Sequence, residues 1–277
     1  MHCKYKHPTL AIGGLGGSGT RAVAQLFIEL GFFMGHDLNT PNDNLLYTLL
    51  FKRKDIFVLT EDELTYRIEL FYKILASNET LSTEELVFLE DLAHNDNPQH
   101  PKEWLLQRVE HLRITSRQEH AIWGWKEPNT HLIIDKLLKF SPNLKFIYVY
   151  RNGLDMAYSS NQNQLKFFGD IFLNEEHIEI TPRNALKYWC KVYERILKLK
   201  QLYPNNIYLL DFDHLCQESG SALRDIFLFM GLSDKLSTNK NFNDMFQLPS
   251  SYQRYQHYSL DDFDDVDRIC IENIYNN

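Results

Sequence analysis

The feature that most constrains this chain is a glycine-rich run close to its start. Five glycines, at positions 13, 14, 16, 17 and 19, stand between an apolar stretch at 9–12 and an amphipathic stretch that ends at Leu30. This order predicts a strand, a tight loop and a helix, with several backbone N–H groups directed at one point. Glycine suits such a loop because it adopts positive φ and lets a ligand approach the backbone closely. We therefore expect a loop that binds an anion.

The residue type at the start of the predicted helix agrees with a bound anion. Arg21 stands in the first helical turn, where the helix dipole disfavours a cation. A phosphate held at the same place would remove that conflict. The alternative is a plain glycine-rich turn that joins a strand to a helix without a ligand.

The rest of the chain alternates between strand-like and helix-like patterns. Apolar runs at 121–125, 145–151 and 207–212 are each followed by a helical pattern, which covers about 129–139 after the first run, whereas 41–119 reads almost entirely as helix. Within 41–119, Thr60–Glu63 and Ser82–Glu85 have the spacing of capping boxes, and Pro101 is expected in the first turn of a helix. Such alternation predicts an α/β fold of three layers, with a parallel central sheet of about four to five strands. We expect one domain over 1–277, in which the mostly helical segment at about 41–119 is inserted as a cap.

Composition narrows the classes of partner. With 277 residues, of which 44% are hydrophobic, the chain is long enough to bury a large core. The net charge of −8 argues against a general nucleic-acid binder. The four cysteines are far apart, which favours idle thiols in a reducing compartment. Since no apolar run approaches the length of about 20 residues that a membrane span needs, we expect a cytoplasmic protein without a membrane span.

A second candidate site lies in the run FIYVYRNGLDMAYSS. Arg151 ends an apolar stretch there, and Ser159 follows on the next predicted helix. A guanidinium fork and a hydroxyl in this arrangement suit a phosphate group. Ligands of parallel sheets bind at the carboxyl ends of the strands. The sequence therefore predicts that the glycine-rich loop, Lys126 and Arg151 share one rim of the sheet.

Two common nucleotide-binding loops fit the glycine run poorly. Gly14, Gly16 and Gly19 match the dinucleotide fingerprint, and Asp37 stands near the place of a ribose-binding acid. That fold needs a second strand directly after the first helix, however, and here mostly helix follows. An ATP- or GTP-hydrolysing loop needs a lysine where Thr20 stands. A dinucleotide-dependent oxidoreductase therefore stays only as a less favoured alternative.

The two constellations together resemble the sulfotransferase family that uses 3′-phosphoadenosine-5′-phosphosulfate (PAPS). GGSGTR resembles the loop that holds the 5′-phosphosulfate, and RNGLDMAYS resembles the 3′-phosphate motif. Trp189, the run LLDFDHL at 209–215 and the helix end FMGL continue the resemblance over most of 9–232. It implies PAPS as the donor, 3′-phosphoadenosine-5′-phosphate (PAP) as the product, and no metal. The residues that it implies for cofactor binding are Gly14, Gly16, Gly17, Ser18, Gly19, Thr20, Arg21, Arg151, Ser159 and Arg254.

One departure from the family pattern concerns the leaving group. Many members carry a lysine in the phosphosulfate loop, and that position here is Gly17. The resemblance suggests Lys126, in WGWKEP, as the substitute that stabilises charge at the sulfuryl group, with Arg21 adding positive charge. Lys126 is otherwise an exposed lysine ahead of a turn proline. The neighbouring Glu127 is either a supporting partner of the site or an exposed residue.

The acceptor and the general base are less constrained. His36, Asp37 and Asp43 follow the first predicted helix and are candidate bases for a hydroxyl acceptor, although each is also an ordinary turn or capping residue. We expect sulfuryl transfer to a hydroxyl or amine of a small-molecule, carbohydrate or lipid acceptor, by a monomer or a homodimer. A non-catalytic nucleotide-binding relative is the alternative, because the loop lysine is missing.

Overall fold

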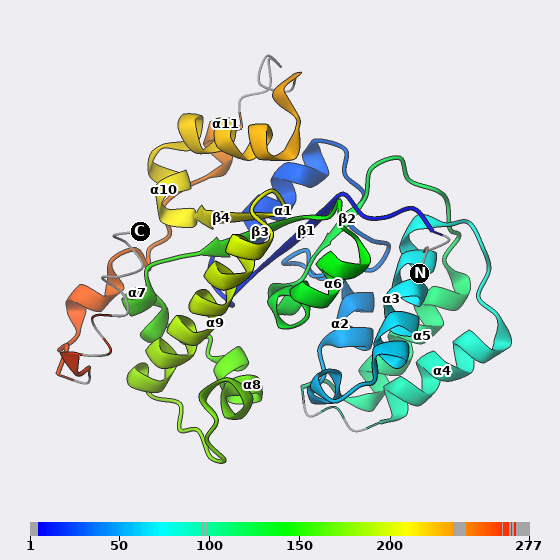
Figure 1. Cartoon of the computed structure of the whole chain (residues 1–277), viewed down its shortest axis with the longest axis horizontal. Helices are drawn as coiled ribbons and strands as arrows, with labels where there is room; N and C mark the ends of the chain where they lie inside the picture. The colour runs from blue at the N-terminus through cyan, green and yellow to red at the C-terminus, as the bar shows by residue number, and fades with distance from the viewer. Residues whose placement is uncertain are drawn as a thin grey trace. The chain divides into compact units, whose positions relative to one another are not determined.

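The computed structural model describes residues 5–95, 97, 99–234, 242–261, 263–265, 267 and 269. Its strands form one parallel sheet, flanked by helices, in the order β2-β1-β3-β4 (Figure 1). This confirms the expected α/β class with a parallel central sheet. The strands are β1 (Leu10–Gly14), β2 (Gly124–Lys126), β3 (Lys145–Tyr150) and β4 (Ile207–Asp211).

Helices account for most of the remaining regular structure (Figure 1). The α-helices are α1 (Thr20–Glu29), α2 (Leu45–Phe51), α3 (Glu61–Ala76), α4 (Thr83–His94), α5 (Lys102–Ile114), α6 (Ile134–Phe140), α7 (Gly153–Ala157), α8 (Asn163–Leu173), α9 (Pro182–Leu202), α10 (Phe212–Gln217) and α11 (Ser219–Met230). Short 3₁₀ turns are η1 (Lys54–Phe57), η2 (Pro128–Leu132), η4 (Asn243–Met245) and η5 (Arg254–His257). Within the described ranges, no helix combines the length and the apolar character needed to cross a bilayer.

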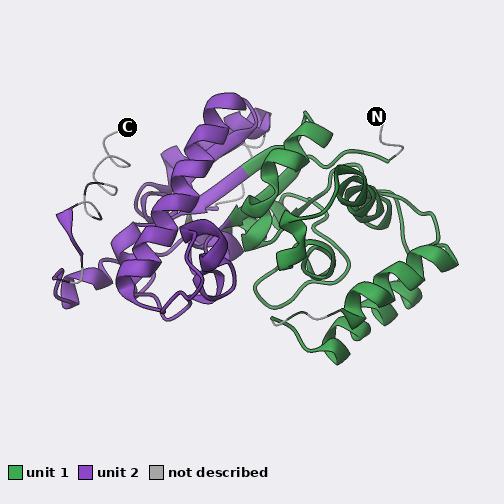
Figure 2. Ribbon diagram, turned by 60° about the horizontal axis from the view of Figure 1, so that its bottom comes forward, with its two compact units in different colours: residues 1–13, 23–146 green, residues 14–22, 147–277 purple. Residues whose placement is uncertain are grey.

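The chain divides into two compact units, which Figure 2 colours separately. Unit 1 consists of residues 1–13 and 23–146, and unit 2 consists of residues 14–22 and 147–277. The glycine-rich loop from Gly14 onward and the RNGLDMAYS motif fall in unit 2, whereas Lys126 and the candidate bases fall in unit 1. The organisation as one domain with a helical insertion at 41–119 stays a prediction.

In unit 1, two helices begin with the capping boxes that the sequence predicts. Thr60 accepts a hydrogen bond from the backbone N–H of Glu63, whose carboxylate accepts from the backbone N–H of Thr60. Ser82 and Glu85 make the same reciprocal pair at the start of α4. Each box satisfies N–H groups that a helix start otherwise leaves unpaired.

The core of unit 1 fixes strand β2, and therefore Lys126. Trp125 is fully buried, stacks on Tyr47 at 6.1 Å between ring centroids and meets Phe71 edge-on at 5.2 Å. Its indole N–H donates to the Thr130 hydroxyl at 3.0 Å. Since aromatic side chains of this size dominate core energetics, the residue next to Trp125 in β2 has little freedom to move.

Some boundaries in unit 1 differ from the expected ones. The strand expected at 121–125 is regular only from Gly124 to Lys126, because Trp123 makes an isolated bridge to Phe33 instead. Pro101 lies just outside α5 rather than in its first turn, with φ −58° and ψ 143°. The helix expected at 129–139 is a 3₁₀ turn followed by α6.

In unit 2, the long helix α9 packs against the short helix α7. Trp189 of α9 is buried, lies against Gly153 and stacks on Tyr193 at 5.2 Å between ring centroids. Elsewhere in the unit, the Asp211 carboxylate accepts from the backbone N–H groups of Asp213 and His214 and so starts α10. These contacts hold the segments that follow β3 and β4.

The cysteines depart from expectation at one position. Cys190 of α9 is disulfide-bonded, so the expectation of idle thiols is wrong for it. Cys216 is a half-buried free thiol, and burial raises its pKa to about 11. Cys3 and Cys270 lie outside the described residues.

The titration of His100 in unit 1 is expected to affect the stability of the protein. His100 stacks on Trp104 at 4.6 Å, and burial followed by the charge of Lys52 lowers its pKa from 6.5 to about 4. The unfolded chain therefore binds a proton that the folded chain excludes, so stability falls as the pH drops from 6.5 toward 4. The full shift corresponds to about 3 kcal/mol, which solvent screening reduces to roughly 1 to 2 kcal/mol.

This expectation is tested with urea unfolding of the wild type and His100→Gln at pH 7 and pH 4.5. The variant is expected to lose less stability between the two pH values, by about 1 to 2 kcal/mol. An equal loss in both proteins would contradict the assigned role of His100.

Candidate functional site

The glycine-rich loop links the end of β1 to the start of α1. Gly17 and Gly19 both have a φ of +94°, a backbone conformation that residues with a Cβ rarely adopt. A Cβ on Gly19 would also lie 2.3 Å from the ring of Phe212. The loop therefore requires glycine at position 19 for its conformation and for its packing.

Two alanine substitutions separate these requirements. Gly19→Ala is expected to lower the free energy of unfolding by about 3 kcal/mol, from backbone strain and overpacking together. Gly17→Ala is the matched control, because it has the same φ and its Cβ would meet only the Ser159 hydroxyl at 3.8 Å. It is expected to cost about 1 kcal/mol. Urea unfolding measures both, and equal losses would contradict the role given to Phe212.

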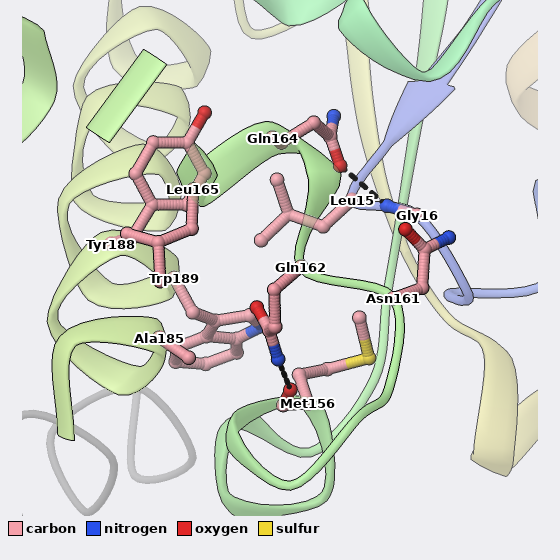
Figure 3. A pocket seen from close by; sticks show the side chains of 10 residues that line it. All are labelled: Leu15, Gly16, Met156, Asn161, Gln162, Gln164, Leu165, Ala185, Tyr188 and Trp189. Atoms are coloured by element: carbon pink, nitrogen blue, oxygen red, sulfur yellow. Dashed lines mark hydrogen bonds between the residues drawn. The ribbon is translucent and has the colours of Figure 1, made fainter. Parts of the chain in front are cut away.

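Gln164 of α8 holds the backbone of the glycine-rich loop with two hydrogen bonds. Its Oε1 accepts from the backbone N–H of Gly16 at 2.6 Å, and its Nε2 donates to the carbonyl of Gly14 at 3.1 Å. Figure 3 shows this side chain beside a cavity of about 10 Å³, which has room for about one water molecule. The cavity also borders Trp189 and Tyr188. A cavity of this size cannot hold a nucleotide.

Several hydrogen-bond donors of the loop have no acceptor among the described residues. Within the described parts of the chain, the backbone N–H groups of Gly17, Gly19, Thr20 and Arg21 donate to no acceptor. The Ser18 hydroxyl is buried and has no partner among the described residues. Buried polar groups without partners are uncommon in folded proteins. This concentration of donors at a helix N-terminus suits an anion.

Arg151 follows directly after β3 and is held as a rigid donor. Its side chain is only 2% exposed. Nε donates to the Asp213 carboxylate at 2.8 Å and Nη1 donates to the Ser251 hydroxyl at 2.9 Å. Nη2 lies 3.8 Å from the Asp155 carboxylate and makes no hydrogen bond to any described residue. The guanidinium is thus fixed on two sides, and one of its nitrogens is free to bind a ligand.

The electrostatic surroundings of Arg151 are mixed. Burial raises the pKa of Asp213, while the neighbouring Arg151 opposes that rise. Asp155 is also buried. The guanidinium therefore already has two carboxylates beside it, so its positive charge is partly neutralised before any anionic ligand binds.

Ser159 lies close to the loop and two residues after α7 ends, so the expectation that it stands on this helix is wrong. The Asn152 side chain caps this short helix by accepting from the N–H groups of Leu154 and Asp155. The Ser159 hydroxyl lies 3.8 Å from the point that a Cβ on Gly17 would occupy. The structure thus brings together, within unit 2, the glycine-rich loop and the serine of the second motif.

Arg254 lies beside the same helix end. Its Nη1 donates to the carbonyl of Tyr158 at 3.2 Å, and its Nε donates to the carbonyl of Ser251 at 3.4 Å. It is therefore placed next to the residue that precedes Ser159. Arg21 is exposed on the first turn of α1. The roles of both arginines toward a cofactor stay predictions.

In unit 1, the structure pairs two of the predicted catalytic residues. Lys126, at the end of β2, is only 2% exposed, so it is not an exposed lysine. Its Nζ forms an ion pair with the Asp43 carboxylate and donates to the carbonyl of Pro41 at 3.1 Å. Asp43 is held in turn by Asn39, whose Nδ2 donates to its carboxylate at 2.9 Å. Lys126 and Asp43 therefore form one ion pair.

The other two candidate bases have separate partners. Both oxygens of Asp37 accept from Arg108 at 3.1 Å, which ties this carboxylate into an ion pair. His36 packs edge-on against Phe33 at 4.7 Å between ring centroids. Burial, followed by the nearby charges of His120, Arg117 and His111, lowers the pKa of His36, so its imidazole is neutral near pH 7.

Glu127 supports the backbone after β2. It is fully buried, and burial raises its pKa. Its carboxylate accepts from the backbone N–H of Asn129 at 2.5 Å and from the Asn129 side chain at 3.0 Å. Of the two readings that the sequence left open, exposure is wrong, and Glu127 caps the 3₁₀ turn next to Lys126.

Two kinds of comparison with known proteins bear on this arrangement. A sequence model of the sulfotransferase family matches residues 8–235, and no curated protein sequence matches significantly. Among solved structures, the chain is similar to a sulfotransferase from Alicyclobacillus acidocaldarius, with 13% identity, coverage of 98% of this chain and 97% of that one, and a TM-score of 0.49. It is also similar to the sulfotransferase domain of the Synechococcus PCC 7002 olefin synthase, with 14% identity, coverage of 99% and 97%, and a TM-score of 0.45.

The sequence match decides the family. It covers the glycine-rich loop, strands β1 to β4, and both Arg151 and Ser159. The match therefore spans well over half of the chain, and it agrees with the resemblance carried by GGSGTR and RNGLDMAYS. The chain belongs to the sulfotransferase family.

Proposed function

We propose that this protein transfers a sulfuryl group from PAPS to a hydroxyl or amine of an acceptor. The observation that carries the proposal is the grouping in unit 2 of two sets of hydrogen-bond donors, each of which we assign to a phosphate group. Open backbone N–H groups of the loop form one, and Arg151 Nη2, which makes no hydrogen bond to any described residue, marks the other. Ser159 belongs to the second motif and lies next to Gly17 of the first. A doubly phosphorylated adenosine has a phosphate for each.

The residues present fit such a cofactor. The Ser18 hydroxyl and Arg151 Nη2 are buried polar atoms without partners among the described residues, and leaving such atoms unpaired costs about 1 to 3 kcal/mol each. An anionic ligand with two separate phosphate groups would satisfy both. We assign the 5′ end to Gly14, Gly16, Gly17, Ser18, Gly19, Thr20 and Arg21, and the 3′-phosphate to Arg151, Ser159 and Arg254.

The roles that we assign to the chain's own residues follow from the negative charge that the leaving phosphate gains during transfer. PAPS, when bound, supplies a sulfuryl group on a phosphate leaving group. We assign Lys126 to stabilise the negative charge that grows on that leaving group, with Thr20 and Arg21 as further donors. Preorganised donors of this kind lower a barrier because they need no reorientation during the reaction. Asp43 keeps the Lys126 ammonium in one position.

A hydroxyl acceptor needs a base, and two residues of unit 1 are candidates. Asp43 carries lone pairs that Lys126 and Asn39 do not use. His36 has a lowered pKa, so it is neutral and able to accept a proton near pH 7. If His36 is the base, kcat is expected to stay constant from about pH 8 to about pH 6.5 and to fall only below that, and His36→Asn removes that dependence.

The acceptor class, a small molecule, carbohydrate or lipid, stays part of the proposal, as do a cytoplasmic location and a homodimer.

The direct experiment measures the thermal stabilisation of the wild type by PAP and then screens acceptors with radiolabelled PAPS. Binding with transfer to an acceptor supports the proposal. Binding of PAP without transfer to any acceptor class would instead support a non-catalytic relative, and absence of binding would contradict both.

A further inference from the structure

The segment of residues 251–258 lies against helix α7, contacts Arg151 of the proposed 3′-phosphate site and contains Arg254, a further residue of that site. Ser251 accepts a hydrogen bond from Arg151, and Arg254 donates to the carbonyl that precedes Ser159. The ring of Tyr258 stacks on that of Tyr158 at 4.1 Å between centroids, with 6° between the planes. Any group that fixes this segment therefore affects the surroundings of Arg151.

Asp155 is the group that fixes it. Its carboxylate is 1% exposed. One oxygen accepts from the backbone N–H of Gln253 at 2.8 Å, and the other accepts from the backbone N–H of Tyr255 at 3.1 Å. Gln253 has a φ of +56°, a conformation uncommon for a residue with a side chain. The bond from its N–H to Asp155 thus helps to hold a strained turn.

Charge alone argues against a carboxylate at this position. Arg151 already pairs with Asp213, and Asp155 adds a second negative charge 3.8 Å from its Nη2. A second carboxylate would repel an incoming phosphate and weaken its binding. Asp155 accepts hydrogen bonds from the backbone N–H groups of Gln253 and Tyr255. These two bonds explain why a carboxylate stands here, whereas its charge does not.

We propose that Asp155 is a positioning residue for the 3′-phosphate, which holds the 251–258 segment against α7 so that Ser251 and Arg254 stay beside Arg151 and Ser159. This inference rests on the proposed function. If the charge of Asp155 acted only by repulsion, its removal would strengthen binding of the 3′-phosphate. The positioning role predicts the opposite. Removal of the negative charge of Asp155 weakens binding of the phosphate rather than strengthening it.

The test compares Asp155→Asn with the wild type by isothermal titration, using two ligands. The variant keeps the shape of the side chain but loses one of the two acceptor oxygens. Its Kd for PAP is expected to rise at least about tenfold, while its Kd for adenosine 5′-phosphosulfate, which lacks the 3′-phosphate, changes less than about twofold. Asp225→Asn, which removes the same charge from an exposed face of α11, is expected to change neither.

A second pair of variants tests the same bond from the other side, in case Asp155→Asn does not fold. Tyr255→Pro removes one N–H donor at the second residue of η5, where proline is compatible with the backbone. Tyr255→Ala also loses the ring but keeps the N–H. Only the proline variant is expected to weaken PAP binding, by at least about fivefold.

The outcomes separate this inference from the proposed function. If the wild type does not bind PAP, the proposed function itself fails. If the wild type binds PAP but Asp155→Asn binds it equally well or more tightly, the positioning role is overturned and the proposed function stands. Equal weakening for PAP and adenosine 5′-phosphosulfate would also overturn it, because the defect would then be general.

Discussion

Replacement of Arg151 by lysine is expected to weaken PAP binding by about 100-fold, which corresponds to about 2.7 kcal/mol. Lysine keeps the charge but not the planar fork, so it cannot hold the Asp213 carboxylate and the Ser251 hydroxyl while also offering a third donor. Isothermal titration with PAP measures the change. The Kd for adenosine 5′-phosphosulfate is expected to change by less than about threefold, because Arg151 is assigned to the 3′-phosphate alone.

Arg151→Ala is the less informative variant, for a physical reason. It leaves Asp155 and Asp213 in a buried site without their cation, and breaking a buried ion pair in this way typically costs about 3 to 5 kcal/mol. Reduced binding in that variant would mix loss of contact with loss of structure. A lysine variant that folds and binds PAP as tightly as the wild type would refute the assignment.

Substitution of Lys126 is expected to have the second large effect, on turnover rather than on binding. Lys126→Ala is expected to lower kcat by about 10² to 10³-fold, the size seen when one preorganised donor is removed from a transition state. The Kd for PAP is expected to change by less than about threefold. Steady-state kinetics with PAPS and an identified acceptor, together with titration of PAP, separate the two effects.

Asp43 supplies the matched variant for Lys126. Asp43→Asn removes the ion pair, but the Lys126 side chain and its positive charge are still present. If Asp43 only positions Lys126, kcat falls by about tenfold and its pH profile keeps its shape. If Asp43 is the general base, kcat falls about as far as in Lys126→Ala. Unchanged turnover in Lys126→Ala would remove this lysine from the mechanism.

Features set by neighbouring residues were accessible from the sequence. The strand, glycine loop and helix at the start of the chain follow from spacing, and so do the capping boxes at Thr60 and Ser82. The parallel sheet follows from the alternation of strand and helix. The loop and the caps depend on hydrogen bonds and periodicities within about four residues, so one sequence is enough to predict them.

The missed parts of the candidate site depend on contacts between distant residues. Gln164 braces Gly14 from 150 positions away, and Asp155 holds Gln253 from 98 positions away. A polar run such as NQNQ at 161–164 is compatible with an exposed loop as well as with a brace. No periodicity marks a single side chain that bonds to a remote backbone, so only the structure identifies these two residues.

The pairing of Lys126 with Asp43 was missed for a related reason. Both were candidates in the sequence, but for different roles, and nothing there links residues 43 and 126. The Asn39 side chain fixes Asp43, and the backbone N–H of Asn44 donates to the carbonyl of Lys126 at 2.7 Å. These bonds in the turn after α1 make the long-range ion pair possible. The structure thus joins two independent candidates in one ion pair.

A crystal structure of the chain grown with PAP tests most directly whether the two motifs hold a single nucleotide. We predict the 5′-phosphate on the backbone N–H groups of Gly17, Gly19 and Thr20, and the 3′-phosphate within hydrogen-bond distance of Arg151 Nη2 and the Ser159 hydroxyl. PAP bound with only one phosphate at these places, or bound elsewhere on the protein, would contradict that claim.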